Sequence, residues 1–460
     1  MNWTERLGLC AILALALVAP AVAEAQGASG AGWLADRDRA EGPGFRVGDF
    51  ELHPGLGVEL GYDSNIYFTD DDDRLMIGTD SAILRAVAHL LFSTRGAQRT
   101  EGGEGASEGG ESAGPPTVTF RGGLSGSFYH YFNANGRTNM EAAADLQLTI
   151  LPQRPFSITL TDTFGRTIRP FTEFTIANTS FAQIQNDAGV RLDFQTDGGI
   201  LRISAGYNLV AGFFEDGNFG YGNRLGHNLS LSETFRFLPQ TAIIHDTSFR
   251  VIDYLNEDTT RGPLVNDGFL LRSRVGLNGA FTTNFSVLAM VGYAAGFFNS
   301  RATVADTYDQ EYDSVVAQVE ARWQILPNVR LNFGYDRDFQ PSYLGNWVRR
   351  DRGYIHFQTL VDRVFLLGAD VSFGYYEYGL ITDVTGGMVG TTGNRADPRF
   401  VGRLFAEYRF TDWLGVNGTF QYQGNYTNFI YDISGLGGSV LIDPASYNKF
   451  EMWLGVRVFY

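Results

Sequence analysis

Few residues in this sequence are spaced in a way that could support catalysis. The six histidines are His53, His89, His130, His227, His245 and His356, and no pair has the spacing of a metal site. A serine-type hydrolase needs a histidine that contacts both an acid and a hydroxyl group. Only His245 has an acid beside it in sequence, Asp246, and adjacent residues of a strand point to opposite faces. We therefore predict no catalytic residue, no metal, no cofactor and no enzyme activity.

Two polar stretches could bind ligands instead. The acids Asp70 to Asp73 in YFTDDDDR lack the alternation of a calcium loop, so we interpret them as a solvated acidic loop. The alternative is a loop that binds divalent cations, or bridges through them to lipopolysaccharide phosphates. The stretch FEDGNFGYGN at 214–223 mixes aromatic, acidic and amide groups that could contact sugars, and it is equally typical of an ordinary exposed loop. The choice between a binding loop and an ordinary exposed loop depends on the elements on either side of each stretch.

The elements on either side of these stretches have the period of β-strands. Apolar residues alternate with polar or small ones from Phe50 to Tyr460. In 365–376, for example, Phe365 and Val371 fall on one face, and Asp370 falls on the other. The predicted strands are 50–62, 80–94, 117–132, 138–151, 156–165, 185–196, 200–213, 224–237, 241–253, 268–281, 285–298, 312–325, 329–340, 352–361, 364–377, 398–410, 414–426 and 448–460.

The connections between these strands alternate in length. Those after even-numbered strands are mostly tiny, such as LPQ at 238–240 and LPN at 326–328, and those after odd-numbered strands are mostly long. Short turns on one rim and long loops on the other are typical of outer-membrane barrels. The acidic, Gly-rich stretch 96–116 falls on the short-turn rim, and we interpret it as a disordered insertion. Glu233 is in phase with apolar residues, so we expect a bulge or a shifted register near it.

Composition narrows the class of protein. Of the 460 residues, 44% are hydrophobic and 14% aromatic, as expected for strands with one apolar face. The net charge of -16 argues against nucleic acid as a partner. Residues 1–25 have the charged start, apolar centre and small-residue cleavage site of a signal peptide, and 26–49 are predicted to be a flexible periplasmic arm.

We predict that residues 50–460 form a closed antiparallel transmembrane β-barrel of about 18 strands. A bilayer leaves no water to pair the edges of an open sheet, so the sheet must close. At this strand number the interior is too wide for side chains to fill, which predicts an aqueous lumen. Its predicted lining includes Arg272, Arg274, Glu320, Arg322, Arg330, Asp336, Arg403, Glu407, Arg409, Asn417 and Gln421.

The segment GLGVELGYDSNIY at 55–67 resembles the first strand of outer-membrane barrels of the "porin 2" kind. The resemblance rests on Tyr62, Asp63, Ser64 and Asn65 and on the architecture of 50–460. It implies a port for exopolysaccharide or capsule export, working with a periplasmic polysaccharide-export partner. The alternative is a passive diffusion porin for small solutes. A barrel with a blocked lumen, structural or adhesive in role, is a third possibility.

The last strand also carries a predicted assembly signal. Phe450, Leu454, Val456, Val458 and Tyr460 lie on one face and end in an aromatic residue, as in strands that barrel assembly machinery recognises. The expected location is the outer membrane of a Gram-negative cell, in contact with membrane lipid and lipopolysaccharide.

Overall fold

The structure is a computed structural model that describes most of the predicted barrel. The described residues are 44–66, 68, 70, 80–94, 117–133, 138–152, 155–168, 182–215, 217–255, 265–299, 311–343, 345–379, 395–432 and 442–460. The predicted signal peptide, most of the predicted arm and the insertion 96–116 lie outside these ranges.

The alternating segments form long antiparallel strands. The barrel strands are β2 (Phe50–Asp63), β3 (Ser81–Thr94), β4 (Val118–Tyr131), β5 (Thr138–Ile150), β6 (Phe156–Thr167), β7 (Gln183–Gln195), β8 (Leu201–Phe214), β9 (Arg224–Leu238), β10 (Thr241–Tyr254), β11 (Gly268–Thr282), β12 (Phe285–Phe298), β13 (Tyr312–Leu326), β14 (Val329–Pro341), β15 (Trp347–Val361), β16 (Phe365–Tyr378), β17 (Ala396–Arg409), β18 (Leu414–Asn425) and β21 (Tyr447–Phe459). Short elements add to them: β1 (Phe45–Val47), β19 (Ile430–Asp432), β20 (Ile442–Pro444), and the 3-10 turns η2 (Asp197–Gly199) and η3 (Gly217–Gly222).

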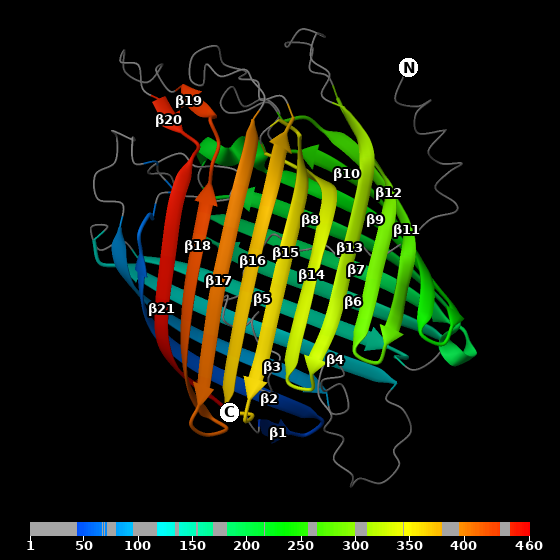
Figure 1. Ribbon diagram of the computed structural model, residues 1–460, viewed down its shortest axis with the longest axis horizontal. Coiled ribbons are helices and arrows are strands. Elements are labelled where there is room, and N and C mark those ends of the chain that lie inside the picture. Colours follow the sequence, from blue (N-terminus) through cyan, green and yellow to red (C-terminus); the bar gives the residue numbers. More distant parts are fainter. Residues whose placement is uncertain are drawn as a thin grey trace.

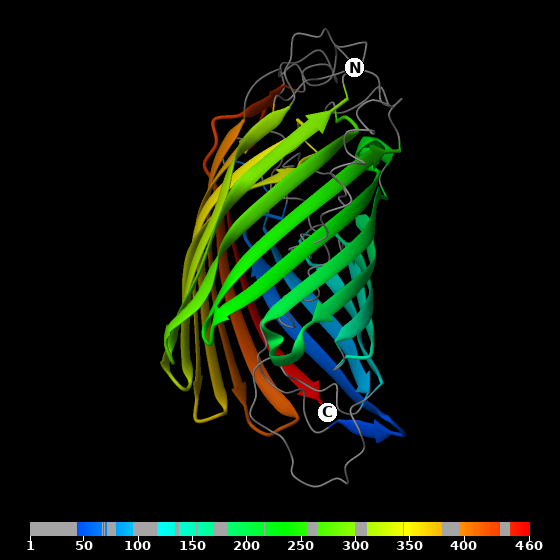
Figure 2. The ribbon, with the colours of Figure 1, turned by 90° about the vertical axis from the view of Figure 1, so that its right-hand side faces the viewer.

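Eighteen of the described strands close into a ring. Each strand from β2 to β18 pairs with the next, and β21 pairs with both β18 and β2. In the closing pair Gly55 lies opposite Phe459 and Asp63 lies opposite Glu451. The strands run obliquely around a barrel, and the carboxyl end lies beside β1 on the short-turn rim (Figures 1 and 2). The predicted fold class is confirmed.

The two faces of the barrel wall differ in chemistry, as the alternation predicts. On β21 the side chains of Leu454, Val456 and Val458 are exposed, whereas those of Trp453 and Arg457, which point to the other face, are buried. Large apolar side chains are exposed on the other strands too, so most of the outer wall matches the hydrocarbon of a bilayer. No helix in the described part of the chain is both long and apolar enough to cross a membrane.

The structure differs from the sequence predictions in the bounds of β15 and in three short strands. β15 begins at Trp347, five residues before the predicted 352, because the charges of WVRRD are paired: Arg350 with Asp336 and Arg349 with Glu377. The last residues of the predicted arm form β1, which pairs with β2. β19 and β20 form a short hairpin inside the last long loop.

The expected correction at Glu233 was wrong. β9 has a register irregularity only beside Thr241 and Ala242, at the turn into β10, and Glu233 keeps its place among the apolar residues of the outer face. It lies opposite His245 of β10 and contacts it, so the polar group has a partner that removes the need for a bulge.

Candidate functional site: the barrel interior

The residues predicted to line the lumen lie on the inner face of the wall. Arg272 of β11 forms an ion pair with Asp338 of β14, and Arg274 reaches Gln318 of β13. Contacts between strands that are not neighbours can form only on the concave side of a closed sheet, where side chains converge. Arg274 also binds Asp246 of β10 through two bonds, of 3.0 and 2.6 Å.

The other predicted lining residues form similar cross-strand contacts. Asp336 accepts bonds from Arg350 and Arg352, both at 2.9 Å, and Glu407 pairs with Arg409 and Arg457. Arg403 pairs with Asp370 at 3.0 Å, and Glu320 with Arg322 and the Tyr354 hydroxyl. Arg330 lies on the same face of β14 as Asp336, and Gln421 lies between Arg403 and Glu451 in the ladder.

The interior is unevenly exposed. Side chains of Arg202 and Arg322 are 53% exposed, which places water on this part of the inner wall. By contrast Glu59, Glu407 and Arg457 are about 1% exposed. The exposed part of the inner wall therefore includes the short-turn ends of β8 and β13, whereas Val316 of β13 and the residues near the closing strands are buried.

A buried network holds the closure from the inside. Glu59 of β2 accepts a bond from Arg85 Nε at 2.5 Å and one from Asn417 Nδ2 of β18 at 2.7 Å. To reach β18, the Glu59 side chain passes over β21 at Gly455, where an added Cβ would come within 2.4 Å of Glu59 Cγ. Glycine is required at this crossing because any side chain would occupy the path of the carboxylate.

The network continues into an aromatic cradle for Arg85. The guanidinium carbon lies 4.3 Å from the ring centre of Trp453, a cation–π contact, and the Tyr129 hydroxyl donates to Glu141 at 2.7 Å. Removing one partner of such a buried pair leaves an uncompensated charge, at a cost of about 3–5 kcal/mol. The closure is therefore fixed by polar contacts as well as by the ladder.

Tyr343, in the turn between β14 and β15, reaches across the interior. The Tyr343 hydroxyl accepts a bond from Gln183 Nε2 of β7 at 3.0 Å, although β7 and β14 lie seven places apart around the ring. Asn346 Oδ1 accepts a bond from the backbone N–H of Asn266 at 2.8 Å. Gly345 and Asn346 have φ of 66° and 65°, the left-handed region that lets so short a turn bend inward.

The turn lies within an aromatic cluster in the half of the barrel nearer the long loops. Tyr343 packs edge-on against Phe214 at 5.3 Å and under the Arg224 guanidinium at 4.3 Å. Phe214 and Tyr221 are buried in this cluster, so these two aromatics of 214–223 are not presented to solvent for contact with external sugars. The interior is therefore bridged from β14 to β7 and β8.

Charge is segregated between the two sides of this bridge. Carboxylates predominate on the inner face from β2 to β7, and arginines predominate from β8 to β11. The acids are Glu51, Glu59, Asp63, Glu141, Asp145, Asp187 and Asp193, and the arginines are Arg202, Arg224, Arg236, Arg250, Arg272 and Arg274. Arg250 donates to the neutral Asn228 at 2.6 Å, and its largest charge influences come from Arg224 and Arg272. A solute in the interior meets an acidic wall and a basic wall that adjoin at the pair of β7 and β8.

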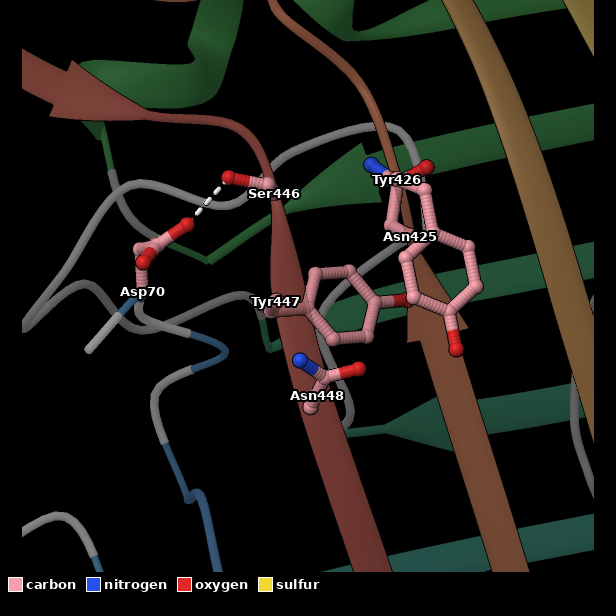
Figure 3. A pocket seen from close by; sticks show the side chains of 6 residues that line it. All are labelled: Asp70, Asn425, Tyr426, Ser446, Tyr447 and Asn448. Carbon is pink, nitrogen blue, oxygen red and sulfur yellow. Dashed lines mark hydrogen bonds between the residues drawn. The ribbon is translucent and has the colours of Figure 1, made fainter. Parts of the chain in front are cut away.

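A separate pocket of about 210 Å³ lies at the long-loop rim (Figure 3). Its lining is Asp70, Asn425, Tyr426, Ser446, Tyr447 and Asn448. The Ser446 hydroxyl donates to Asp70, the first acid of YFTDDDDR. Asp71 to Asp73 lie outside the described residues. The hydrogen bond from Ser446 to Asp70 therefore connects the first long loop to the start of the last barrel strand.

The histidines are dispersed around the wall. Asp246 faces inward to Arg274 whereas His245 faces outward, as predicted for sequence neighbours on a strand. No group of three or more His, Cys, Asp or Glu side chains in the described ranges is placed to hold a metal ion. The interior is thus built from ion pairs, amides and aromatic rings.

The predicted assembly strand has its apolar residues on the outer face. Leu454 is the most exposed of them, and Phe450 lies between Tyr62 and Phe420. Tyr460 stacks on Phe45 of β1 at 4.2 Å, and its N–H donates to the Pro54 carbonyl at 3.0 Å. The carboxyl end is thus bound to β1 and β2 on the short-turn rim.

These features define a transmembrane β-barrel with a charged, bridged interior. No family model and no curated protein match the sequence. Solved structures of outer-membrane porins are similar in fold. OccAB4 of Acinetobacter baumannii has 9% identity, a TM-score of 0.42 and coverage of 89% of this chain and 98% of its own. OpdQ of Pseudomonas aeruginosa has 10% identity, a TM-score of 0.43 and coverage of 90% of this chain and 98% of its own. The outer membrane protein OpdK of the same organism has 10% identity, a TM-score of 0.43 and coverage of 89% of this chain and 99% of its own.

Proposed function

We propose that this protein is an outer-membrane channel for passive diffusion of small hydrophilic solutes. The carrying observation is the contact between Tyr343 and Gln183, which bridges an interior built from ion pairs, amides and aromatic rings. A bridge of this kind divides the cross-section and limits the size of a solute that can pass. The exposed arginines Arg202 and Arg322 support a water-filled entrance at the short-turn end of the interior.

The charge segregation adds a preference to this channel. Arg224, Arg250 and Arg272 lie on neighbouring strands beside the bridge. Arg272 is neutralised by Asp338, but Arg250 has an amide as its hydrogen-bond partner, which leaves a positive surface on this wall. Small solutes that carry a carboxylate would be attracted to this positive surface, and the acidic wall would orient a cationic group of the same solute.

Export of exopolysaccharide or capsule, the leading function predicted from the sequence, has no support in the described residues. A bridged interior fits the alternative, passive diffusion, better than the passage of a long polymer. We keep the "porin 2" resemblance, the signal peptide and the assembly partners as predictions.

The test is conductance together with solute uptake. The full chain in planar bilayers should show steady open channels, and proteoliposomes should swell in small sugars and amino acids but not in oligosaccharides. Deletion of the gene should leave surface polysaccharide unchanged. A closed barrel without conductance, combined with loss of surface polysaccharide on deletion, would overturn the proposal.

A further inference from the structure

Four polar side chains form a hydrogen-bonded cluster on the outer, lipid-facing wall. Glu233 Oε2 of β9 lies 3.1 Å from His245 Nδ1 of β10, and His245 Nε2 lies 3.1 Å from Ser273 Oγ of β11. Thr247 Oγ1 lies 2.8 Å from Ser273 Oγ and 3.2 Å from His245 Nε2. An acid, a histidine and a serine are thus joined in the order that activates a serine nucleophile.

The neighbours of these residues fix the side of the wall on which they lie. Asp246 and Arg274 bind each other on the inner face, so His245 and Ser273, adjacent to them in sequence, point outward. Glu233 is in phase with Leu229 and Phe235, whose side chains are exposed at 41% and 46%. The cluster is therefore reached from the lipid and not from the interior.

The cluster is costly for the fold, which indicates a function. A charged residue on the lipid face of a barrel is destabilising, most of all near the bilayer midplane and less near the interface. The Glu233 and His245 side chains stay accessible, at 39% and 27%, so they are not hidden within the wall. Ionisable groups at membrane depth are by default candidates for a functional site.

The depth of the cluster suits a lipid ester. His245 lies four residues from Thr241, the first residue of β10 at the short-turn rim, which is about 13 Å along the strand at roughly 3.3 Å per residue. Strand tilt of about 40° reduces this to roughly 10 Å of height. The histidine is therefore in the half of the bilayer next to the short turns, within reach of acyl groups and of interfacial water.

The cluster is surrounded by apolar side chains that an acyl chain could contact. Ile243, Leu271 and Val275 lie next to it on β10 and β11, and their exposed fractions are 40%, 42% and 50%. The surface therefore combines an activated hydroxyl with a hydrocarbon-binding wall.

We propose that Ser273, His245 and Glu233 form a hydrolase site for carboxylic esters of membrane lipids. Ser273 is the nucleophile, His245 is the general base and then the general acid, and Glu233 is a positioning residue. With His245 protonated at Nδ1, this N–H donates to Glu233 and Nε2 accepts the serine proton. The Thr247 hydroxyl is the donor for the oxyanion, because the backbone N–H groups of β10 and β11 are held in the ladder.

The reaction balances with water as the second reactant. Ser273 Oγ attacks the acyl carbonyl carbon and its proton passes to His245 Nε2. The bond from that carbon to the alcohol oxygen breaks, and the alcohol leaves with the proton from Nε2. A water molecule then gives a proton to Nε2 and attacks the acyl-serine ester. The fatty acid leaves, and Ser273 Oγ regains its proton.

Sequence reasoning missed this site because it considered only Asp246 as a partner for His245. The two-residue turn at 239–240 sets the β9–β10 register, so the pairing of Glu233 with His245 could have been derived from sequence. Ser273 follows the long loop 255–267, which leaves its register undetermined by local signals.

The test uses the full-length folded barrel in mixed micelles of detergent and diacyl phospholipid. Wild type should release fatty acid and form a covalent adduct with a fluorophosphonate probe, which peptide mass spectrometry locates on Ser273. Ser273→Ala and His245→Ala should each lower turnover by at least about 100-fold. Thr247→Val should keep the Ser273 adduct but slow turnover.

His227→Ala is the matched control. His227 is another histidine of the outer face, bonded to the Tyr207 hydroxyl at 2.8 Å and remote from the cluster, and its loss should leave turnover unchanged. Heat-modifiable migration on a gel verifies that each variant is folded. Folded wild type that forms no adduct and releases no more fatty acid than Ser273→Ala would overturn the proposal, as would an adduct on Thr247. Channel conductance should be the same in Ser273→Ala, so failure here is separate from failure of the channel function.

Discussion

Gln183 on β7 donates a hydrogen bond to the Tyr343 hydroxyl, 3.0 Å away, from the far side of the barrel. The turn that follows β14 is thereby joined through the interior to β7, seven strands away in the ring. The contact makes the short turn between β14 and β15 a part of the channel and not of the rim.

Loss of the Tyr343 ring should widen the passage. Tyr343→Ala removes the bridge and the packing against Phe214, so single-channel conductance should rise, roughly 1.5-fold or more, because the free cross-section grows. Tyr343→Phe is the control: it removes only the hydroxyl and should leave mean conductance near that of wild type. Equal conductance in all three proteins would show that the turn does not limit the path.

Charge at Arg250 should set ion preference. Arg250→Gln removes a guanidinium whose hydrogen-bond partner is the Asn228 amide. The ratio of chloride to potassium permeability, from reversal potentials in a salt gradient, should fall about twofold or more, and less at high salt. Arg322→Gln is the control, since Arg322 lies at the short-turn end of β13 and is paired with Glu320. An unchanged ratio in Arg250→Gln would mean that ions avoid this wall.

The crossing of Glu59 over Gly455 should be intolerant of any side chain. Gly455→Ala places a methyl group 2.4 Å from Glu59 Cγ and should break the bond to Asn417, so the barrel should unfold at lower temperature on a heat-modifiability gel. We expect a cost of about 3 kcal/mol if the buried carboxylate loses its partners. In Gly418→Ala the nearest atom lies 3.7 Å from the new Cβ, an ordinary contact, and stability should be retained. Equal loss in both variants would contradict the role given to Glu59.

Replacement of Tyr460 should impair assembly more than channel properties. Tyr460→Asp puts a charge on the outer face beside Phe45 and alters the aromatic end that the assembly machinery is predicted to recognise. We expect less folded protein in the outer membrane, measured by surface labelling, with unchanged conductance of the molecules that insert. Phe45→Ala separates recognition from packing, because it removes only the stacking partner. Normal surface levels of Tyr460→Asp would count against a carboxy-terminal signal.

Strand positions could be predicted because their signal is local. Alternation places Leu454 and Arg457 on opposite faces without knowledge of any partner strand. The start of β15 was placed late because Arg349 and Arg350 look like loop residues until their acids on β14 and β16 are known. The sequence of the turn 342–346 contains no signal that Tyr343 reaches β7, because that contact depends on the curvature of the whole ring.

The pairing of β21 with both β18 and β2 has a consequence for timing. Until β21 takes its place, the sheet has two open edges, β2 and β18, and each exposes a row of unpaired backbone groups. The edge of the first barrel strand therefore stays unpaired until the last strand has folded. Because these two strands are far apart in sequence, we expect their pairing to be a slow step of folding. A mutation that slows the pairing of β21 would lengthen the time for which both edges are exposed. The expected loss is therefore in the number of assembled barrels and not in the conductance of each one.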